Sequence, residues 1–261
     1  MQKIALAMLA VIAACSSGCV HSSDVFVEPD AGPCGGSTPS TLRVVTWNIR
    51  AALSSSLDQI ATDLAALDPD VVMLQEVDRH ADRSGDVDQA TVLAEKLGMN
   101  STFAASRTEG RGDFGVALLS RIAFESARRV ALPSDNAFEP RVAIDAHLCS
   151  GDLHLRAASV HADVYPWAAR QNADFLAENL KESLGEGVVV GGDLNSAPDG
   201  DGPAAFTTRG FIDASADAPT FGSRRIDYVF VDHAAGSVDQ REVPDTGDDS
   251  DHRPQLVELT R

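Results

Sequence analysis

The stretch Val188-Val189-Val190-Gly191-Gly192-Asp193-Leu194-Asn195 decides the fold expected for this chain. Its three valines form an uninterrupted apolar run bounded by glycines, which is typical of a fully buried strand. Two polar side chains, Asp193 and Asn195, follow this strand directly, where they can enter a cleft. The unit that this stretch defines is a buried strand that ends in polar residues.

The same unit recurs along the chain. Asp and Asn are common turn residues, so any one of these positions has a purely structural explanation. Together, however, they predict one cleft into which several strand ends project. The other polar positions at strand ends are Asn48, Gln75, Glu76, His161, Asp163, Asp227, Asp251 and His252.

Strands predominate between these positions, and helices separate only some of them. The hydrophobic periodicity predicts strands at 42–49, 71–74, 115–120, 124–132, 141–149, 153–160, 188–190, 226–231 and 256–259. It predicts helices at 57–67, 89–97 and 167–184, a loop at 106–114 and an acidic loop at 239–251. Without a strict strand–helix alternation, the pattern favours an α/β fold of two packed sheets with helices outside. A single doubly wound sheet is the alternative.

Residues 1–19 are typical of an export signal. Lys3 is their only charge, and 4–14 is an unbroken apolar run that is too short to span a bilayer. One aliphatic and two small residues precede Cys15, which resembles the lipobox of bacterial lipoproteins. We therefore expect an exported protein of the bacterial outer membrane or cell envelope, periplasmic or at the surface, anchored by a lipid on Cys15 or, second, on Cys19. Signal cleavage without a lipid is the alternative.

A flexible tether and one domain follow the signal. Residues 20–40 are rich in Ser, Gly, Pro and Asp and lack an apolar period, whereas 41–261 form the expected catalytic domain. Cys34 in the tether and Cys149 in the domain either pair in an oxidising compartment or stay free. We expect the protein to be a monomer.

The charge balance limits the partners. Lys and Arg number 21 against 39 Asp and Glu, which gives a formal net charge of -18. This balance argues against a protein that coats nucleic acid by charge alone, because phosphate binding depends on Lys and Arg. It leaves open an enzyme that binds phosphate through a metal ion. Four cysteines in 261 residues exclude a disulfide-built scaffold.

The candidate residues suit metal-assisted hydrolysis. Asn48, Glu76 and Asp251 offer the oxygen ligands that Mg²⁺ prefers. The sequence has no Cys/His cluster of zinc-site spacing, no Gly-x-Ser-x-Gly elbow and no Walker-type loop. Attack by an activated water is therefore favoured over a covalent route.

Five further residues offer groups that handle a proton or a phosphate. His161 and His252 can donate to phosphate oxygens or position a proton. Asp193 is a candidate base for the attacking water, and Asn195 can orient water or phosphate. Asp227 can fix the ring of His252 by accepting from its second nitrogen.

Six segments resemble the motifs of the endonuclease/exonuclease/phosphatase superfamily, in the order of that family. They are TWNI (46–49), LQEVD (74–78), SVHAD (159–163), GGDLNSAP (191–198), RIDYVFV (225–231) and SDHRP (250–254). The resemblance implies a four-layer α/β/β/α sandwich of two mostly antiparallel sheets. It also implies Mg²⁺- or Mn²⁺-dependent cleavage of a phosphate ester. Many relatives have Gly-Asn-Ala where this chain has Gly115-Val116-Ala117. The chain therefore lacks the polar contact that this asparagine can make near the site.

The resemblance also implies roles on the metal side of the site. Glu76 corresponds to the principal metal ligand, and Asp251 to a further ligand on the metal side. Asn48 corresponds to a residue that contacts phosphate or metal-bound water. Arg141 stands about where relatives place an arginine that faces the phosphate.

The remaining roles concern the reacting phosphate. Asp193 and Asn195 correspond to residues that bind and orient the nucleophile and the scissile phosphate. His252, paired with Asp227, and His161 correspond to residues that stabilise the transition state from two sides. Whether Asp193 or a histidine takes the proton from water stays open.

These observations predict an exported, membrane-tethered phosphoesterase that depends on a divalent metal. Its expected substrates are a lipid headgroup, a small phosphorylated molecule or nucleic acid, and a phosphodiester is favoured over a monoester. A secreted nuclease that acts on extracellular DNA is the first alternative. A surface lipoprotein that binds without catalysis is the second.

Overall fold

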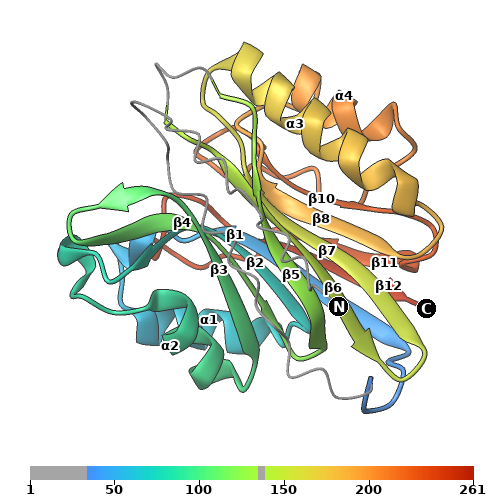
Figure 1. Ribbon diagram of the computed structural model, residues 1–261, viewed down its shortest axis with the longest axis horizontal. Coiled ribbons are helices and arrows are strands. Elements are labelled where there is room, and N and C mark those ends of the chain that lie inside the picture. Colours follow the sequence, from blue (N-terminus) through green and yellow to red (C-terminus); the bar gives the residue numbers. More distant parts are fainter. Residues whose placement is uncertain (1–33, 135–138) are drawn as a thin grey trace, which may run out of the picture.

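The computed structural model of the protein describes residues 34–134 and 139–261. The predicted signal at 1–19 and most of the predicted tether lie outside the described residues. Two six-stranded sheets pack face to face, and helices cover the outer face of each sheet (Figure 1). The prediction of two packed sheets with outer helices is confirmed, and the doubly wound alternative is wrong.

The first sheet lies beneath two helices. Its strands are β1 (Thr41–Asn48), β2 (Val71–Arg79), β3 (Asn100–Glu109), β4 (Gly112–Ser120), β11 (Ser237–Glu242) and β12 (Gln255–Thr260). Their order across the sheet is β11-β12-β1-β2-β4-β3. The helices are α1 (Leu57–Leu67) and α2 (Gln89–Leu97), and two short 3-10 turns, Arg50–Ala52 and Asp82–Ser84, flank the strand ends.

The second sheet lies beneath the other two helices. Its strands are β5 (Ala123–Ala131), β6 (Val142–Ser150), β7 (Leu153–His161), β8 (Val188–Asp193), β9 (Ile212–Asp213) and β10 (Asp227–Val231), and their order is β5-β6-β7-β8-β10-β9. Helix α3 (Pro166–Leu180) continues into a 3-10 turn (Lys181–Ser183), and α4 (Asp201–Thr207) packs beside α3. In both sheets most neighbouring strands are antiparallel, and β1–β2 and β7–β8 are parallel pairs.

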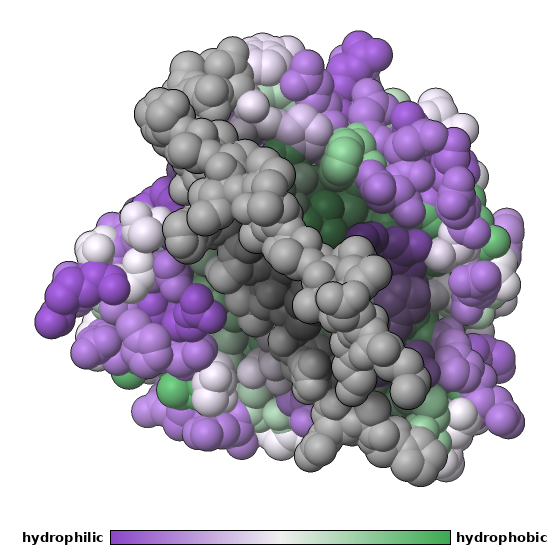
Figure 2. Space-filling view, viewed as in Figure 1, coloured by the Kyte–Doolittle hydropathy of each residue, from purple (hydrophilic) through white to green (hydrophobic). Residues whose placement is uncertain are grey.

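Three apolar layers hold the four structural layers together. Side chains such as Leu42, Met73 and Val189 fill the space between the sheets and are fully buried. Trp47, with α1 and α2, forms the layer under the first sheet, and Tyr228, with α3 and α4, forms the layer under the second. Hydrophilic residues cover most of the visible described surface (Figure 2).

The sequence did not predict the strands β3, β9 and β11 or the helix α4. The edge strand β11 is almost entirely exposed and pairs with β12 through its backbone, so no alternation of apolar residues marks it. Its residues 239–242 were expected to belong to an acidic loop. Residues 106–114 were likewise expected to form a loop, but they belong to the hairpin of β3 and β4. The two-residue strand β9 and the seven-residue helix α4 are too short to show a period.

A disulfide bond fastens the start of the described chain to the second sheet. Cys34 is bonded to Cys149, with their Cα atoms 5.3 Å apart, so the reading in which both cysteines stay free is wrong. Two hydrogen bonds reinforce the attachment: Ser150 Oγ donates to the Ser37 carbonyl at 3.0 Å, and the Asp152 amide donates to Thr38 Oγ1 at 2.8 Å. Within the described residues, none of the helices has the length and apolar character needed to cross a membrane.

Candidate functional site

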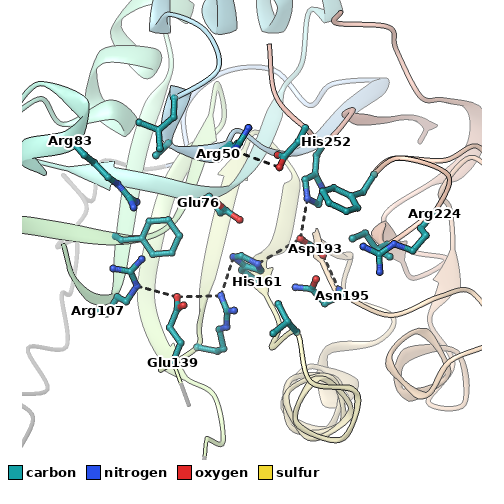
Figure 3. Close-up of a pocket in the computed structure, with 18 residues that line it drawn as sticks. Arg50, Glu76, Arg83, Arg107, Glu139, His161, Asp193, Asn195, Arg224 and His252 are labelled. Atoms are coloured by element: carbon teal, nitrogen blue, oxygen red, sulfur yellow. Dashed lines mark hydrogen bonds and ion pairs between the residues drawn. The ribbon is translucent and has the colours of Figure 1, made fainter. Parts of the chain in front are cut away.

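A cavity of about 550 Å³ opens where strand ends from both sheets meet (Figure 3). The parallel pairs bring these ends together, because β1 and β2 finish side by side in one sheet, and β7 and β8 do so in the other. Most predicted site residues line this cavity: Glu76, Arg141, His161, Asn195, Asp193, Asp251 and His252. Asn48 and Asp227 do not line it but contact residues that do.

Glu76 owes its direction to an irregularity in β2. The pairing of β2 with β4 shifts between Gln75 and Val77, so Glu76 has no partner across the strand. Its φ of 54° lies in the left-handed region that non-glycine residues rarely adopt. Such a bulge re-aims one side chain, and strained backbone is common at functional sites. The glutamate therefore faces the cavity instead of the core.

Asn48 connects the two sheets through its side-chain amide. Its Nδ2 donates to Glu76 Oε1 at 3.1 Å and to Asp193 Oδ2 at 3.2 Å. Its Oδ1 accepts from the Arg50 amide at 3.1 Å, which fixes the orientation of the group. One fully buried asparagine thus holds two carboxylates of different sheets at the floor of the cavity.

Asp193 is the centre of the arrangement. It ends β8, is almost fully buried, and accepts from the Asn195 amide at 2.8 Å through Oδ1. Its Oδ2 lies 3.6 Å from His161 Nε2 and 3.7 Å from His252 Nε2. Burial, together with the negative charge of Asp227, raises the pKa of Asp193 to about 7. A carboxyl group that titrates near neutrality can both accept and return a proton.

His252 and Asp227 form a buried ion pair. His252 Nδ1 lies 2.9 Å from Asp227 Oδ2, and the Asp227 side chain is inaccessible to solvent. Burial opposes the charge of His252, but the Asp227 carboxylate outweighs it and raises the pKa of the imidazole to about 9. The ring is held further by Phe221, whose centroid lies 4.6 Å away, and the backbone carbonyl of His252 accepts from Trp47 Nε1 at 2.9 Å.

His161 has the opposite environment. Its Nδ1 faces Arg141 Nη1 at 3.4 Å, and both side chains are more than nine-tenths buried. Burial, followed by the positive charges of Arg141 and His252, places the pKa of His161 well below its ordinary value. The two histidines beside Asp193 therefore differ in charge at neutral pH.

Asn195 follows Asp193 in the turn after β8. Its φ of 48° is left-handed, a conformation that asparagine tolerates better than most residues. Its Nδ2 donates to the carbonyl of Ala162 at 3.1 Å, so the turn is joined to the end of β7.

The donor set on the Glu76 side suits a hard divalent cation. Glu76 and Asp251 both present carboxylate oxygens to the cavity, and no described residue donates a hydrogen bond to Glu76 Oε2. Mg²⁺ typically takes one or two carboxylates and keeps several waters, which this pair allows. Among the described residues of the site, the compact His/carboxylate set is a different one, Asp193, Asp227 and His252, whose ligand atoms lie within 4.8 Å of one another.

Further cavity residues carry no motif that would have revealed them. Arg50 Nε lies 3.6 Å from Asp251 Oδ2, and Arg107 lines the cavity from a segment that was expected to be a loop. The remaining charged residues of this group are Arg83, Glu139 and Arg224. They come from separate turns and strands, so only the three-dimensional arrangement identifies them.

Comparison with known proteins agrees with this architecture. A structure from Beutenbergia cavernae DSM 12333, described as an endonuclease/exonuclease/phosphatase, superposes with a TM-score of 0.74 at 23% identity and covers 85% of this chain and 72% of that one. The mannosyl-6-phosphatase of Bacteroides thetaiotaomicron VPI-5482 gives 0.70 at 22% identity, with 84% and 100% covered. The human Nocturnin catalytic domain with bound sulfate gives 0.68 at 20% identity, with 91% and 97% covered.

At these identities the structural matches establish the fold and not the substrate. No curated protein sequence matches the chain. The model of the Endonuclease/Exonuclease/phosphatase family, however, matches residues 45–252, which is well over half of the sequence and includes the strand ends that border the cavity. The chain therefore belongs to the endonuclease/exonuclease/phosphatase family and has the phosphoesterase fold of that family.

Proposed function

We propose that the protein is a phosphoesterase that depends on a divalent metal, Mg²⁺ or Mn²⁺, and hydrolyses a phosphodiester by in-line attack of water. One observation carries the proposal. A buried carboxylate, Asp193, lies between two imidazoles and shares the amide of Asn48 with Glu76. This arrangement supports the proposal, because it would supply a proton acceptor, donors for a phosphate and oxygen ligands for a metal around one cavity.

The protein groups divide the work as follows. Glu76 and Asp251, with Asn48 nearby, would hold the cation, which when bound would withdraw charge from the phosphate oxygens. Asp193, with a pKa of about 7, is suited to take a proton from the attacking water. Asn195 would hold that water or a phosphate oxygen in line with the bond that breaks.

The imidazole of His252 would stabilise the charge that develops on the phosphate. Asp227 keeps the ring oriented and protonated at neutral pH, so its Nε2–H can donate to a phosphate oxygen. Donors that are fixed before the reaction cost no reorganisation in the transition state, which is why they lower the barrier.

The electrostatics favour a small substrate. The chain carries a net charge of -18, which slows the approach of any polyanion. The cavity of about 550 Å³ suits a headgroup-sized or nucleotide-sized ester. Most arginines of its wall already pair with carboxylates, such as Arg107 with Glu139 and Arg50 with Asp251. A long nucleic acid is therefore not the preferred substrate.

Export as a lipoprotein is a second part of the proposal. It rests on the apolar leader, on the lipobox-like residues before Cys15, and on the Cys34–Cys149 disulfide, since such bonds persist in oxidising compartments. Replacing Cys15 by Ser should release the protein from the membrane fraction. A protein that stays membrane-bound after that change but is released by Cys19→Ser would move the anchor to the second cysteine.

The activity is tested on purified protein without residues 1–19, with Mg²⁺, Mn²⁺ or Ca²⁺. Bis(p-nitrophenyl) phosphate, p-nitrophenyl phosphate, phosphatidylcholine vesicles and supercoiled plasmid serve as substrates. We expect metal-dependent hydrolysis of the diester to exceed that of the monoester. Plasmid nicking as the dominant activity would support the nuclease alternative, and failure on every ester with every metal would refute the proposal.

A further inference from the structure

We propose that Arg141 and Glu139 are positioning residues that hold His161 in the tautomer with its proton on Nε2. His161 is then a permanent hydrogen-bond donor toward the reaction centre and is excluded as the base that takes the proton from water. The catalytic part of this inference rests on the proposed function, whereas the tautomer itself does not. The two are therefore tested separately.

The tautomer follows from the contact between Arg141 and His161. Arg141 Nη1 lies 3.4 Å from His161 Nδ1, and Arg141 is 7% exposed and His161 6% exposed. A guanidinium has donors and no acceptor, so the imidazole nitrogen that faces it must offer a lone pair. The ring proton of neutral His161 is consequently on Nε2, which lies 3.6 Å from Asp193 Oδ2.

Glu139 keeps the guanidinium in place. Its Oε1 lies 3.5 Å from Arg141 Nη1 and 3.3 Å from Arg107 Nε, so the carboxylate bridges two arginines. The Arg107 guanidinium lies 4.4 Å from the centroid of the Phe114 ring, and this contact holds Arg107 in place. Figure 3 shows Arg107 and Glu139 along one wall of the cavity, and a line of contacts from Glu139 to His161 and on to Asp193.

The second imidazole beside Asp193, that of His252, has the opposite partner at Nδ1. Its Nδ1 faces Asp227 Oδ2 at 2.9 Å, and a carboxylate only accepts, so Nδ1 must carry a proton. The two imidazoles thus present Nε2 to the same oxygen of Asp193 from rings whose Nδ1 atoms have opposite roles. His161 Nε2 already carries the ring proton, and a second proton would have to go to Nδ1, where it would break the contact with Arg141.

The consequence is an assignment of roles. His161 binds a phosphate oxygen as a donor, and the acceptance of the water proton is left to Asp193. Arg141 acts through His161 rather than by touching the substrate. A double-mutant cycle separates these two possibilities, because residues that act through one another are not additive.

The first experiment measures the tautomer directly. Long-range ¹H–¹⁵N spectra of metal-free protein with ¹⁵N-labelled histidine are recorded at pH 7, and His161→Gln assigns the signal. We expect His161 to carry its proton on Nε2 only. Arg141→Met should abolish this single-tautomer pattern, and Arg141→Lys, which also offers only donors, should retain it. Arg111→Met, which removes an exposed arginine paired with Asp82, is the control and should change nothing.

The second experiment uses steady-state hydrolysis of bis(p-nitrophenyl) phosphate. We expect Arg141→Met and His161→Gln each to lower kcat on the order of tenfold to a hundredfold, and the double variant to be no slower than His161→Gln alone. A proton on Nδ1 of His161 in the native protein would overturn the inference even if Arg141→Met failed to fold. Additive losses in kcat would refute the positioning role. An inactive native protein with the expected tautomer would count against the proposed function only.

Discussion

The buried carboxyl group of Asp193 should make the folded protein less stable than it would be without that charge. In the unfolded chain Asp193 has its ordinary pKa of 3.8, and in the folded chain its pKa is about 7. The folded state therefore binds the proton more tightly, and stability falls as the pH rises from about 4 to about 7. We expect Asp193→Asn, which cannot ionise, to escape this loss.

The magnitude follows from the two pKa values. A tenfold change in proton affinity is worth about 1.4 kcal/mol, so the difference between 3.8 and about 7 corresponds to about 4 kcal/mol above pH 7. Asparagine has one acceptor oxygen where the carboxylate has two. The variant must therefore lose one of the bonds from Asn48 and Asn195, at about 1–2 kcal/mol. The expected net gain at pH 8.5 is about 2 kcal/mol, and it should disappear or reverse at pH 5.

The assay is urea unfolding of the leaderless protein in EDTA, followed by far-UV circular dichroism at several pH values between 5 and 8.5. Asp145→Asn is the matched control. Burial tends to raise the pKa of Asp145, but hydrogen bonds from Arg156 and Arg128 outweigh it and lower that pKa. Asp145→Asn should thus destabilise the protein by a similar amount throughout this pH range, because the contribution of a carboxylate with a lowered pKa is lost only below about pH 4. A pH-independent difference between wild type and Asp193→Asn would refute the reasoning.

Other changes test other parts of the structure. Glu76→Gln should raise the Mg²⁺ concentration for half-maximal activity more than tenfold, and EDTA should abolish turnover without altering the circular dichroism spectrum. Cys34→Ser should lower the free energy of unfolding by about 2–4 kcal/mol, because the bond to Cys149 closes a loop with a sequence separation of 115, and equal urea midpoints would contradict this. Arg224, whose guanidinium lies 4.9 Å above the ring of Phe221, has no carboxylate partner among the described residues. Arg224→Gln should raise KM for bis(p-nitrophenyl) phosphate about tenfold with little change in kcat, and an unchanged KM would exclude it from substrate binding.

The sequence predicted those parts of the fold that depend on buried side chains. Strands such as 188–190 and helices such as 57–67 carry a clear apolar pattern, because one or both of their faces are covered. The strand at 237–242 is held by backbone bonds at an exposed edge, so its side chains record nothing of its conformation. A pattern of side chains cannot reveal a strand that forms only because its backbone pairs with the neighbouring strand.

The candidate site divides in a similar way. Residues next to strand ends, such as Asp193 and His161, could be singled out because a polar group after an apolar run is visible in the sequence, and the structure brings them to one cavity. The bulge that redirects Glu76 depends on pairing with β4, which one segment cannot show. Arg83 and Arg224 enter the cavity from unrelated turns, so their participation appears only in the folded chain.

Because the Asn48 amide joins Glu76 in one sheet to Asp193 in the other, we expect the activity to depend on how the two sheets are aligned. A slide of one sheet past the other by a fraction of an ångström would stretch its contact with Asp193 while leaving its contact with Glu76 intact. Substituting a larger or a smaller side chain between the sheets, for instance at Met73, should therefore abolish the activity under conditions in which the protein is still folded.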